Sequence, residues 1–291
     1  MPHDQPVVRV EAADGHRFEL IDVCPRRCRR TLLLLPGLGI AARHYIAFAR
    51  HLARSGTRVL IHEWRGTGSS DRRADRARDW GYRELIEVDL DAALAAAHDA
   101  AEREPVWLAG HSLGSQLCCI LAGRHPERAA GLVLIAGGAP YSRVFPWPMR
   151  LALAVVLRLF PLLSRIVGHF PGKRLGFAGT EAHGVMRDWA WTGRTGRYDL
   201  PTLGFSPERR MAKLALPVLT VRMGDDGWVP PTSVNYLLGF LPGCRTESAE
   251  ISSALQGARA DHFRWLKSPE AAAAGIERWL QRAGTQATHR P

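Results

Sequence analysis

The residues best suited to do chemistry lie in the pentapeptide Gly110-His111-Ser112-Leu113-Gly114. An apolar run, Val106 to Ala109, precedes it, and a helix-like stretch from Ser115 to Arg124 follows it. A serine between glycines in a sharp strand-to-helix turn is held in a strained conformation with its hydroxyl exposed, as in a nucleophile elbow. The pattern therefore predicts Ser112 as a nucleophile, with His111 as structural support for the turn. The alternative is a glycine-softened turn between a buried strand and a buried helix.

A second set of reactive side chains, Cys24 and Cys28, suggests a metal site at first sight. No further Cys or His pair stands at zinc-finger spacing, and the two arginines between the thiols would oppose a divalent cation. We therefore expect no metal and no cofactor. The five cysteines form no regular framework, and the N-terminus lacks a basic start followed by an apolar stretch. These features predict reduced thiols and a cytoplasmic protein.

Length and composition limit the kind of protein further. A chain of 291 residues with 46% hydrophobic residues can bury one large core, or one core with an inserted lid. The net charge of +11 could indicate a nucleic-acid partner. The arginines are spread over the whole chain, however, and no basic motif interleaved with aromatic residues occurs. We therefore expect no nucleic-acid partner and attribute the charge to an arginine-rich composition.

The elements that must position Ser112 alternate between strand and helix. After an N-terminal hairpin around Asp14-Gly15, the apolar strands are nearly continuous, as in a parallel sheet buried on both faces. The sequence therefore predicts an α/β core. The expected strands are 31–35, 58–62, 106–109, 132–135, 217–221 and 245–251, and the expected helices are 41–54, 82–103, 115–124, 232–241 and 268–282.

The alternation stops between Ala139 and about Ser206, where the chain is rich in Pro, Trp and Arg. Because the sheet pattern is intact on both sides, this interruption indicates an inserted cap. We predict a discontinuous core, residues 1–139 and 207–291, with a cap or lid at residues 140–206.

This order of elements resembles the α/β-hydrolase family over essentially the whole chain. The resemblance rests on an antiparallel start, the loop Leu35-Pro36-Gly37-Leu38-Gly39 after the third strand, the elbow after the fifth, the cap after the sixth and an acidic turn after the seventh. Phe170 to Gly176 and Asp261 to Trp265 are similar to segments of a bacterial subgroup of predicted hydrolases. The resemblance implies a mostly parallel eight-stranded sheet flanked by helices, with a helical cap inserted after the sixth strand.

The resemblance also implies the partners of Ser112, because in this family an acid and then a histidine follow the serine along the chain. Only His262 and His289 follow residue 226, and His289 lies in a polar tail, so His262 is the expected base. Asp226 stands a few residues before a Val-Pro pair and is the expected orienting acid. Asp225 remains the alternative.

An oxyanion hole is expected from two backbone N–H groups, those of Leu38 and Leu113. Pro36 cannot donate, while Gly37 and Gly39 let the loop approach the site closely. The alternative for this loop is a plain strand-to-helix turn.

Substrate specificity is expected to lie in the cap. Its stretch from Leu151 to Val167 is strongly apolar, but Arg158, Pro161 and Arg165 interrupt it. The longest run without a charge is therefore far below the roughly 20 residues that a membrane-spanning helix needs. At about 100° per residue, Arg150 falls in one sector with Arg158 and Arg165, opposite a broad apolar face. That face either packs on the core, which we favour, or covers an acyl-binding cleft or makes weak contact with a lipid interface.

Together these residues predict a serine hydrolase that cleaves a carboxylic ester or a related acyl bond through an acyl-Ser112 intermediate. The expected partner is a small, apolar acyl substrate. Two alternatives remain: an acyltransferase on the same Ser112, Asp226 and His262, and a non-catalytic module that holds a ligand in the capped cleft.

Overall fold

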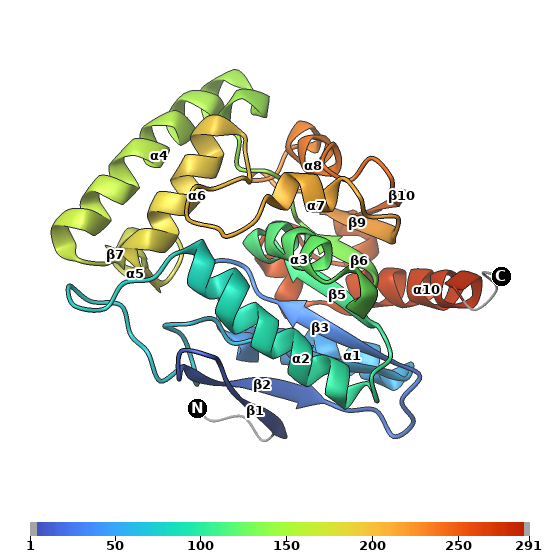
Figure 1. Cartoon of the computed structure of the whole chain (residues 1–291). Coiled ribbons are helices and arrows are strands. Elements are labelled where there is room, and N and C mark those ends of the chain that lie inside the picture. Colours follow the sequence, from blue (N-terminus) through green and yellow to red (C-terminus); the bar gives the residue numbers. More distant parts are fainter. Residues whose placement is uncertain (1–4, 288–291) are drawn as a thin grey trace.

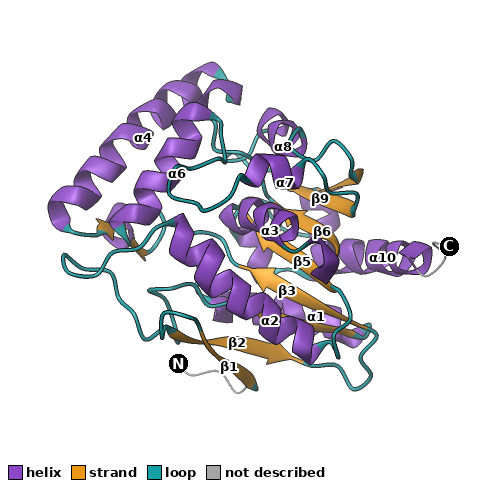
Figure 2. Ribbon diagram, viewed as in Figure 1, coloured by secondary structure: helices purple, strands orange, loops and turns teal. Residues whose placement is uncertain are grey.

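A twisted eight-stranded sheet forms the centre of the molecule, as the computed structural model in Figures 1 and 2 shows. The structure describes residues 5–287, with side chains described to residue 284, so His289 lies outside the described residues. The strand order is β1-β2-β4-β3-β5-β6-β9-β10, and only the pairs β1–β2 and β2–β4 are antiparallel. The predicted mostly parallel sheet of eight strands is confirmed. Its strands are β1 (Val7–Glu11), β2 (Arg17–Val23), β3 (Arg30–Leu35), β4 (Thr57–Ile61), β5 (Val106–His111), β6 (Ala129–Ile135), β9 (Pro217–Met223) and β10 (Arg245–Ile251).

Helices cover both faces of this sheet because its strands are apolar on both sides. In β3, Leu32 and Leu34 pack in one hydrophobic cluster with α1 and α10, while Leu33 and Leu35 pack in another with α2, α3 and α8. These helices are α1 (Ile46–Arg54), α2 (Asp91–Ala100), α3 (Leu113–Arg124), α8 (Pro231–Leu238) and α10 (Glu270–Ala287). Shorter helical turns are η1 (Ala42–Tyr45), η3 (Pro126–Arg128), α9 (Ser253–Gln256) and η5 (Arg264–Lys267).

The helix expected over residues 82–103 differs from the prediction. A π-helix, η2 (Glu84–Leu90), comes first and passes directly into α2. Asp89, in the wider turn, is fully buried and accepts hydrogen bonds from Arg65. The helical run ends before Glu102 and Arg103, whose φ values are positive, at 54° and 69°.

Residues 140–206, called segment 140–206 below, lie in the chain between β6 and β9. The segment carries η4 (Ser142–Val144), α4 (Trp147–Val167), β7 (Phe170–Pro171), α5 (Gly172–Leu175), β8 (Thr180–Glu181) and α6 (His183–Thr195), and α7 (Pro207–Met211) follows it. In Figure 2 the long helices α4 and α6 lie beyond the carboxyl ends of the parallel strands. Their buried apolar side chains belong to the same hydrophobic cluster as α2 and α3. The division of the chain into core and cap stays a prediction.

Within residues 5–287, no helix combines the length and the apolar character that are needed to cross a membrane.

Candidate active site

Ser112 occupies the sharp turn between β5 and α3. Its backbone has φ 53° and ψ −117°, which is the strained conformation expected of a nucleophile elbow. Glycine is required on both sides. A Cβ on Gly110 would lie 2.2 Å from the backbone of Gly114, and a Cβ on Gly114 would lie 2.2 Å from the carbonyl oxygen of Leu35. The two glycines therefore let β5, β3 and α3 meet closely enough to form the turn.

The structure brings Ser112, His262 and Asp226 together from three separate loops. The Nε2 atom of His262 lies 3.0 Å from Oγ of Ser112, and its Nδ1 lies 2.8 Å from Oδ2 of Asp226. Because a carboxylate only accepts, Nδ1 carries the proton and Nε2 is left to accept from the serine hydroxyl. The side chains of His262 and Asp226 are almost fully buried. A serine, an imidazole and a carboxylate in this order can perform nucleophilic acyl chemistry.

The two neighbouring acids after β9 have different partners. Oδ1 of Asp226 accepts from the backbone N–H groups of Trp228, at 2.7 Å, and Val229, at 3.2 Å, which aims Oδ2 at His262. Asp225 instead accepts from the Ser253 hydroxyl and from the backbone N–H of Ala260. These bonds, that of Ser253 first, lower the pKa of Asp225. Asp226 thus contacts His262, while Asp225 fastens the turn after β9 to the loop that leads to His262.

Leu38 and Leu113, the expected oxyanion-hole residues, line the same cavity as Ser112. The loop that carries Leu38 approaches segment 140–206 very closely. Gly39 has a φ of 72°, and a Cβ on it would lie 1.9 Å from the backbone nitrogen of Gly179. No larger residue fits there without moving one of the two backbones.

A chain of buried hydrogen bonds connects this loop with the His262 loop. No sequence pattern indicates its central member, Tyr45. The Gly37 N–H donates to Oη of Tyr45 at 2.8 Å, and the Tyr45 hydroxyl donates to Nδ1 of His111 at 2.7 Å. The Nε2–H of His111 then donates to the carbonyl oxygen of His262 at 2.9 Å. Burial holds the pKa of His111 well below its usual value, so the imidazole is neutral and carries one proton. Trp64 Nε1 also donates to the carbonyl oxygen of Pro36, at 3.1 Å.

The cavity beside Ser112 has a volume of about 1060 Å³ and is lined mainly by apolar side chains. Met149, Leu153 and Phe160 of α4 line one wall, and Trp189 of α6 and Phe177 contribute aromatic rings. This size suits a small organic molecule, and the lining suits an apolar one.

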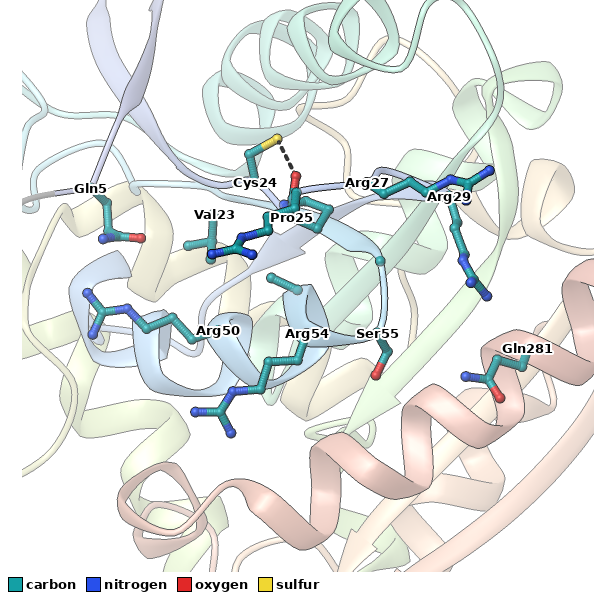
Figure 3. Close-up of a pocket in the computed structure, with 13 residues that line it drawn as sticks. Gln5, Val23, Cys24, Pro25, Arg27, Arg29, Arg50, Arg54, Ser55 and Gln281 are labelled. Atoms are coloured by element: carbon teal, nitrogen blue, oxygen red, sulfur yellow. Dashed lines mark hydrogen bonds between the residues drawn. The ribbon is translucent and has the colours of Figure 1, made fainter.

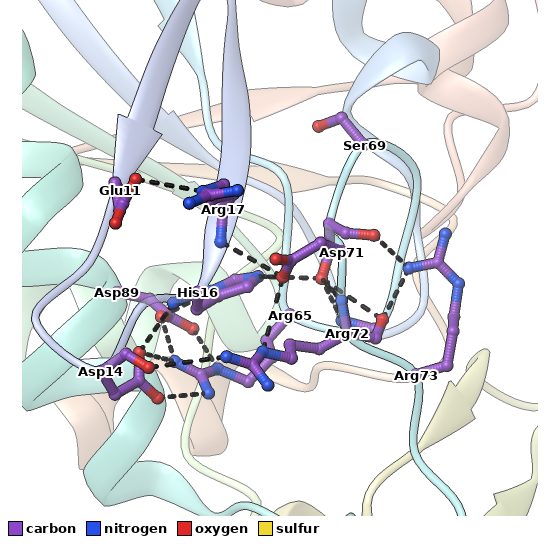
Figure 4. Close-up of polar contacts among 12 residues, drawn as sticks. Glu11, Asp14, His16, Arg17, Arg65, Ser69, Asp71, Arg72, Arg73 and Asp89 are labelled. Atoms are coloured by element: carbon purple, nitrogen blue, oxygen red, sulfur yellow. Dashed lines mark hydrogen bonds and ion pairs between the residues drawn. The ribbon is translucent and has the colours of Figure 1, made fainter.

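A second Ser–His–Asp arrangement is formed by residues that do not line this cavity. Figure 4 shows His16 and Asp89 within the surrounding network of polar contacts. Nδ1 of His16 is 2.8 Å from Asp89, and its Nε2 is 2.8 Å from Oγ of Ser70. All three residues are buried, and Arg65 bridges Asp89 and Asp14 with bonds of 2.6 and 2.7 Å. Their wide separation in the chain hides this set from sequence reasoning. The arrangement fastens the N-terminal hairpin to the loop after β4 and to η2, and exposes no nucleophile.

The Cys24–Cys28 loop lies at the amino end of β3, whereas Ser112 lies beyond the carboxyl end of β5. Both thiols are free and bond to backbone carbonyls, those of Pro25 and Arg30. Among residues 5–287, no three His, Cys, Asp or Glu side chains are grouped to hold a metal ion. The loop instead borders a hollow of about 740 Å³, shown in Figure 3. Five arginines line this arginine hollow: Arg26, Arg27, Arg29, Arg50 and Arg54.

Known proteins resemble this chain over most of its length. Residues 30–249 match the family model of the α/β hydrolase fold. Rhodomycin D methylesterase of Streptomyces sp. (strain C5) is 27% identical over 75% of this chain and 83% of its own length. A putative carbamate hydrolase of Azorhizobium caulinodans is 26% identical over 74% of this chain and 80% of its own length.

Among solved structures, a thermophilic esterase from Thermogutta terrifontis has the same fold. Its TM-score is 0.63 at 17% identity, and the match covers 96% of this chain and 99% of the esterase chain. The elbow, the strand order and the family match agree: this chain belongs to the α/β-hydrolase family and is a hydrolase.

Proposed function

We propose that this protein is a serine hydrolase that cleaves a carboxylic ester of an apolar acid through an acyl-Ser112 intermediate. The observation that carries the proposal is the pair of bonds made by His262, 3.0 Å to Ser112 and 2.8 Å to Asp226, beside an apolar cavity. The similarity to a methylesterase supports an ester as the bond that is cleaved. The similarity to a putative carbamate hydrolase supports acyl chemistry more broadly.

In the first half of the reaction, Oγ of Ser112 attacks the ester carbonyl carbon while Nε2 of His262 takes the hydroxyl proton. The Asp226 carboxylate stabilises the resulting imidazolium and holds its orientation. His262 then gives the proton to the leaving alcohol oxygen as the carbon–oxygen bond breaks. The acyl group remains as an ester on Ser112.

In the second half, His262 takes a proton from water, and the hydroxide oxygen attacks the acyl carbon. Collapse of this intermediate breaks the bond to Ser112, which regains its proton from His262. In both halves the carbonyl oxygen becomes negative. The backbone N–H groups of Leu38 and Leu113 would stabilise that charge, which typically accounts for a factor of about 10²–10³ in kcat per donor.

The roles of the two serine–histidine sets can be separated with a fluorophosphonate probe. We expect the wild type to be labelled and Ser112→Ala to remain unlabelled. Ser70→Ala is the matched control, because Ser70 also bonds to a His–Asp pair but is buried. Labelling of folded Ser112→Ala, or no labelling of folded wild type, would contradict the proposal, and the second result would favour a non-catalytic binding module.

Substrate preference can be measured with p-nitrophenyl esters of increasing acyl length. Because the cavity is apolar, each buried methylene should raise kcat/KM by about fourfold until the cavity is filled, from a burial free energy of about 0.8 kcal/mol. Ser112→Ala and His262→Ala should lower kcat by on the order of 10⁶-fold. If an added alcohol receives the acyl group in preference to water, the protein is an acyltransferase on the same residues.

A further inference from the structure

Helix α4 carries a row of large apolar side chains that nothing in the described chain covers. They recur every three or four residues and so fall within about 120° of the helix surface. Each is between 47% and 73% exposed, and together they are called the outer stripe: Trp147, Leu151, Val155, Leu159, Leu162 and Ile166. In Figure 1, α4 runs along the outer edge of the molecule with α6 beside it.

The outer stripe is separate from the apolar side chains that α4 uses within the fold. Met149, Leu153, Val156 and Phe160 line the cavity, and Leu157 is fully buried. The helix is therefore apolar on two sides, and folding buries only one of them. A contiguous row of six exposed apolar side chains is rare on a soluble monomer and marks a surface that binds something.

The charges beside the outer stripe indicate what binds there. Arg150, Arg158 and Arg165 are exposed along one edge of it, and α4 contains no Asp or Glu. Near the carboxyl end of α4, Nη2 of Arg76 donates to the carbonyl oxygen of Ile166. Two copies of this helix packed stripe to stripe would bring together arginines without any acid from either helix. An anionic surface supplies the missing negative charge.

Helix α4 is continuous although it contains a proline, Pro161. Pro161 has no N–H, so the carbonyl of Leu157 lacks its usual donor within the helix. Nη1 of Arg194, at the end of α6, donates to that carbonyl at 3.1 Å. The 21 residues of α4 thus present a preformed stripe about 30 Å long, at 1.5 Å per residue. A preformed helix loses little conformational entropy when it binds.

We propose that the outer stripe docks this protein on an anionic lipid surface, with α4 lying in the plane of the interface. The six apolar side chains enter the boundary between headgroups and acyl chains, and the arginines contact the phosphate groups. The inner side of α4 keeps its contacts with the cavity. Docking requires no membrane span and no rearrangement of the fold.

Flotation with vesicles tests this docking. We expect the wild type to float with vesicles of mixed phosphatidylglycerol and phosphatidylcholine and not with phosphatidylcholine alone. Leu151→Ser/Leu159→Ser should lower the partition coefficient by at least about tenfold, because two apolar side chains no longer enter the lipid. Neither residue lines the cavity. Arg158→Gln/Arg165→Gln should lower it by about fivefold for each arginine.

The arginine hollow provides the matched control. Arg26→Gln/Arg27→Gln removes the same charge from a distant surface and should leave flotation unchanged. Circular dichroism and turnover of a short soluble ester establish that each variant is folded.

Three flotation results would overturn the proposal. They are no flotation of the wild type with anionic vesicles, flotation of Leu151→Ser/Leu159→Ser equal to that of the wild type, or a loss of flotation in Arg26→Gln/Arg27→Gln as large as that in Arg158→Gln/Arg165→Gln. A wild-type dimer in sedimentation equilibrium that becomes monomeric in the Leu151→Ser/Leu159→Ser variant would also overturn it, in favour of a second copy on the stripe.

Discussion

The variant Tyr45→Phe removes one hydroxyl group that holds the loops of the site but takes no part in the proposed reaction. The phenol is fully buried and lies between the Gly37 N–H and Nδ1 of His111. Phenylalanine fills nearly the same volume but leaves both of those polar groups without a partner. Each unsatisfied buried group costs about 1–3 kcal/mol, so the loss of a partner for two such groups should lower the free energy of unfolding by about 2–6 kcal/mol.

Tyr82 offers a matched control for this change. It is also fully buried, but its hydroxyl has no hydrogen-bond partner among the described residues. Tyr82→Phe should therefore leave the free energy of unfolding unchanged or raise it by about 1 kcal/mol. Urea unfolding followed by circular dichroism measures both variants under the same conditions.

Activity gives a second measurement on Tyr45→Phe. The Gly37 loop carries Leu38, so its displacement should lower kcat for an ester substrate by about 10–100-fold while KM changes little. Equal losses of stability for Tyr45→Phe and Tyr82→Phe would refute the reasoning. The hydrogen bonds of the Tyr45 hydroxyl would then contribute nothing to the free energy of unfolding. Unchanged kcat in Tyr45→Phe would show that the loop is held by other contacts, such as that of Trp64.

Three further predictions concern neighbouring parts of the structure. Asp226→Asn should lower kcat by on the order of 10³–10⁴-fold, whereas Asp225→Asn should stay within about tenfold of wild type in the same ester assay. Gly114→Ala should prevent correct folding of the elbow, seen as lost fluorophosphonate labelling and a lower melting temperature, because its Cβ would lie 2.2 Å from the Leu35 carbonyl oxygen. Burial raises the pKa of Glu181 from 4.5 to about 7, so the folded state holds a proton that the unfolded state releases between these values, and stability falls as pH rises through this window. In urea unfolding, Glu181→Gln should remove this dependence and be more stable than wild type at about pH 8.5, by up to about 3 kcal/mol.

The fold and the proposed reactive groups have strong local signals in the sequence. The elbow is marked by two glycines that the backbone contacts of Gly110 and Gly114 require, and the strands are marked by apolar runs such as that of β3. The placement of Asp226 and His262 depended on chain order, which the family resemblance supplied. The catalytic roles of these residues remain predictions.

The contacts that could not be predicted from the sequence join residues far apart in the chain. Tyr45 and His111 lie 66 residues apart, and His16 and Asp89 lie 73 apart, so no local pattern connects them. The apolar character of α4 could be recognised in the sequence. Which of its faces is covered depends on where α6 packs, and the sequence does not show this. Likewise, the π-helical turn at Asp89 follows from no residue preference, and its place coincides with the buried partners Arg65 and His16.

The contact between Gly39 and Gly179 limits how this scaffold can diversify. The two backbones lie so close that neither glycine has room for a side chain larger than a hydrogen atom. We therefore expect no substitutions or insertions at this contact. The side chains of α4 and α6 that face the cavity carry no such restriction. Changes in substrate range within this lineage should therefore accumulate on those two helices, while the glycine contact persists unchanged.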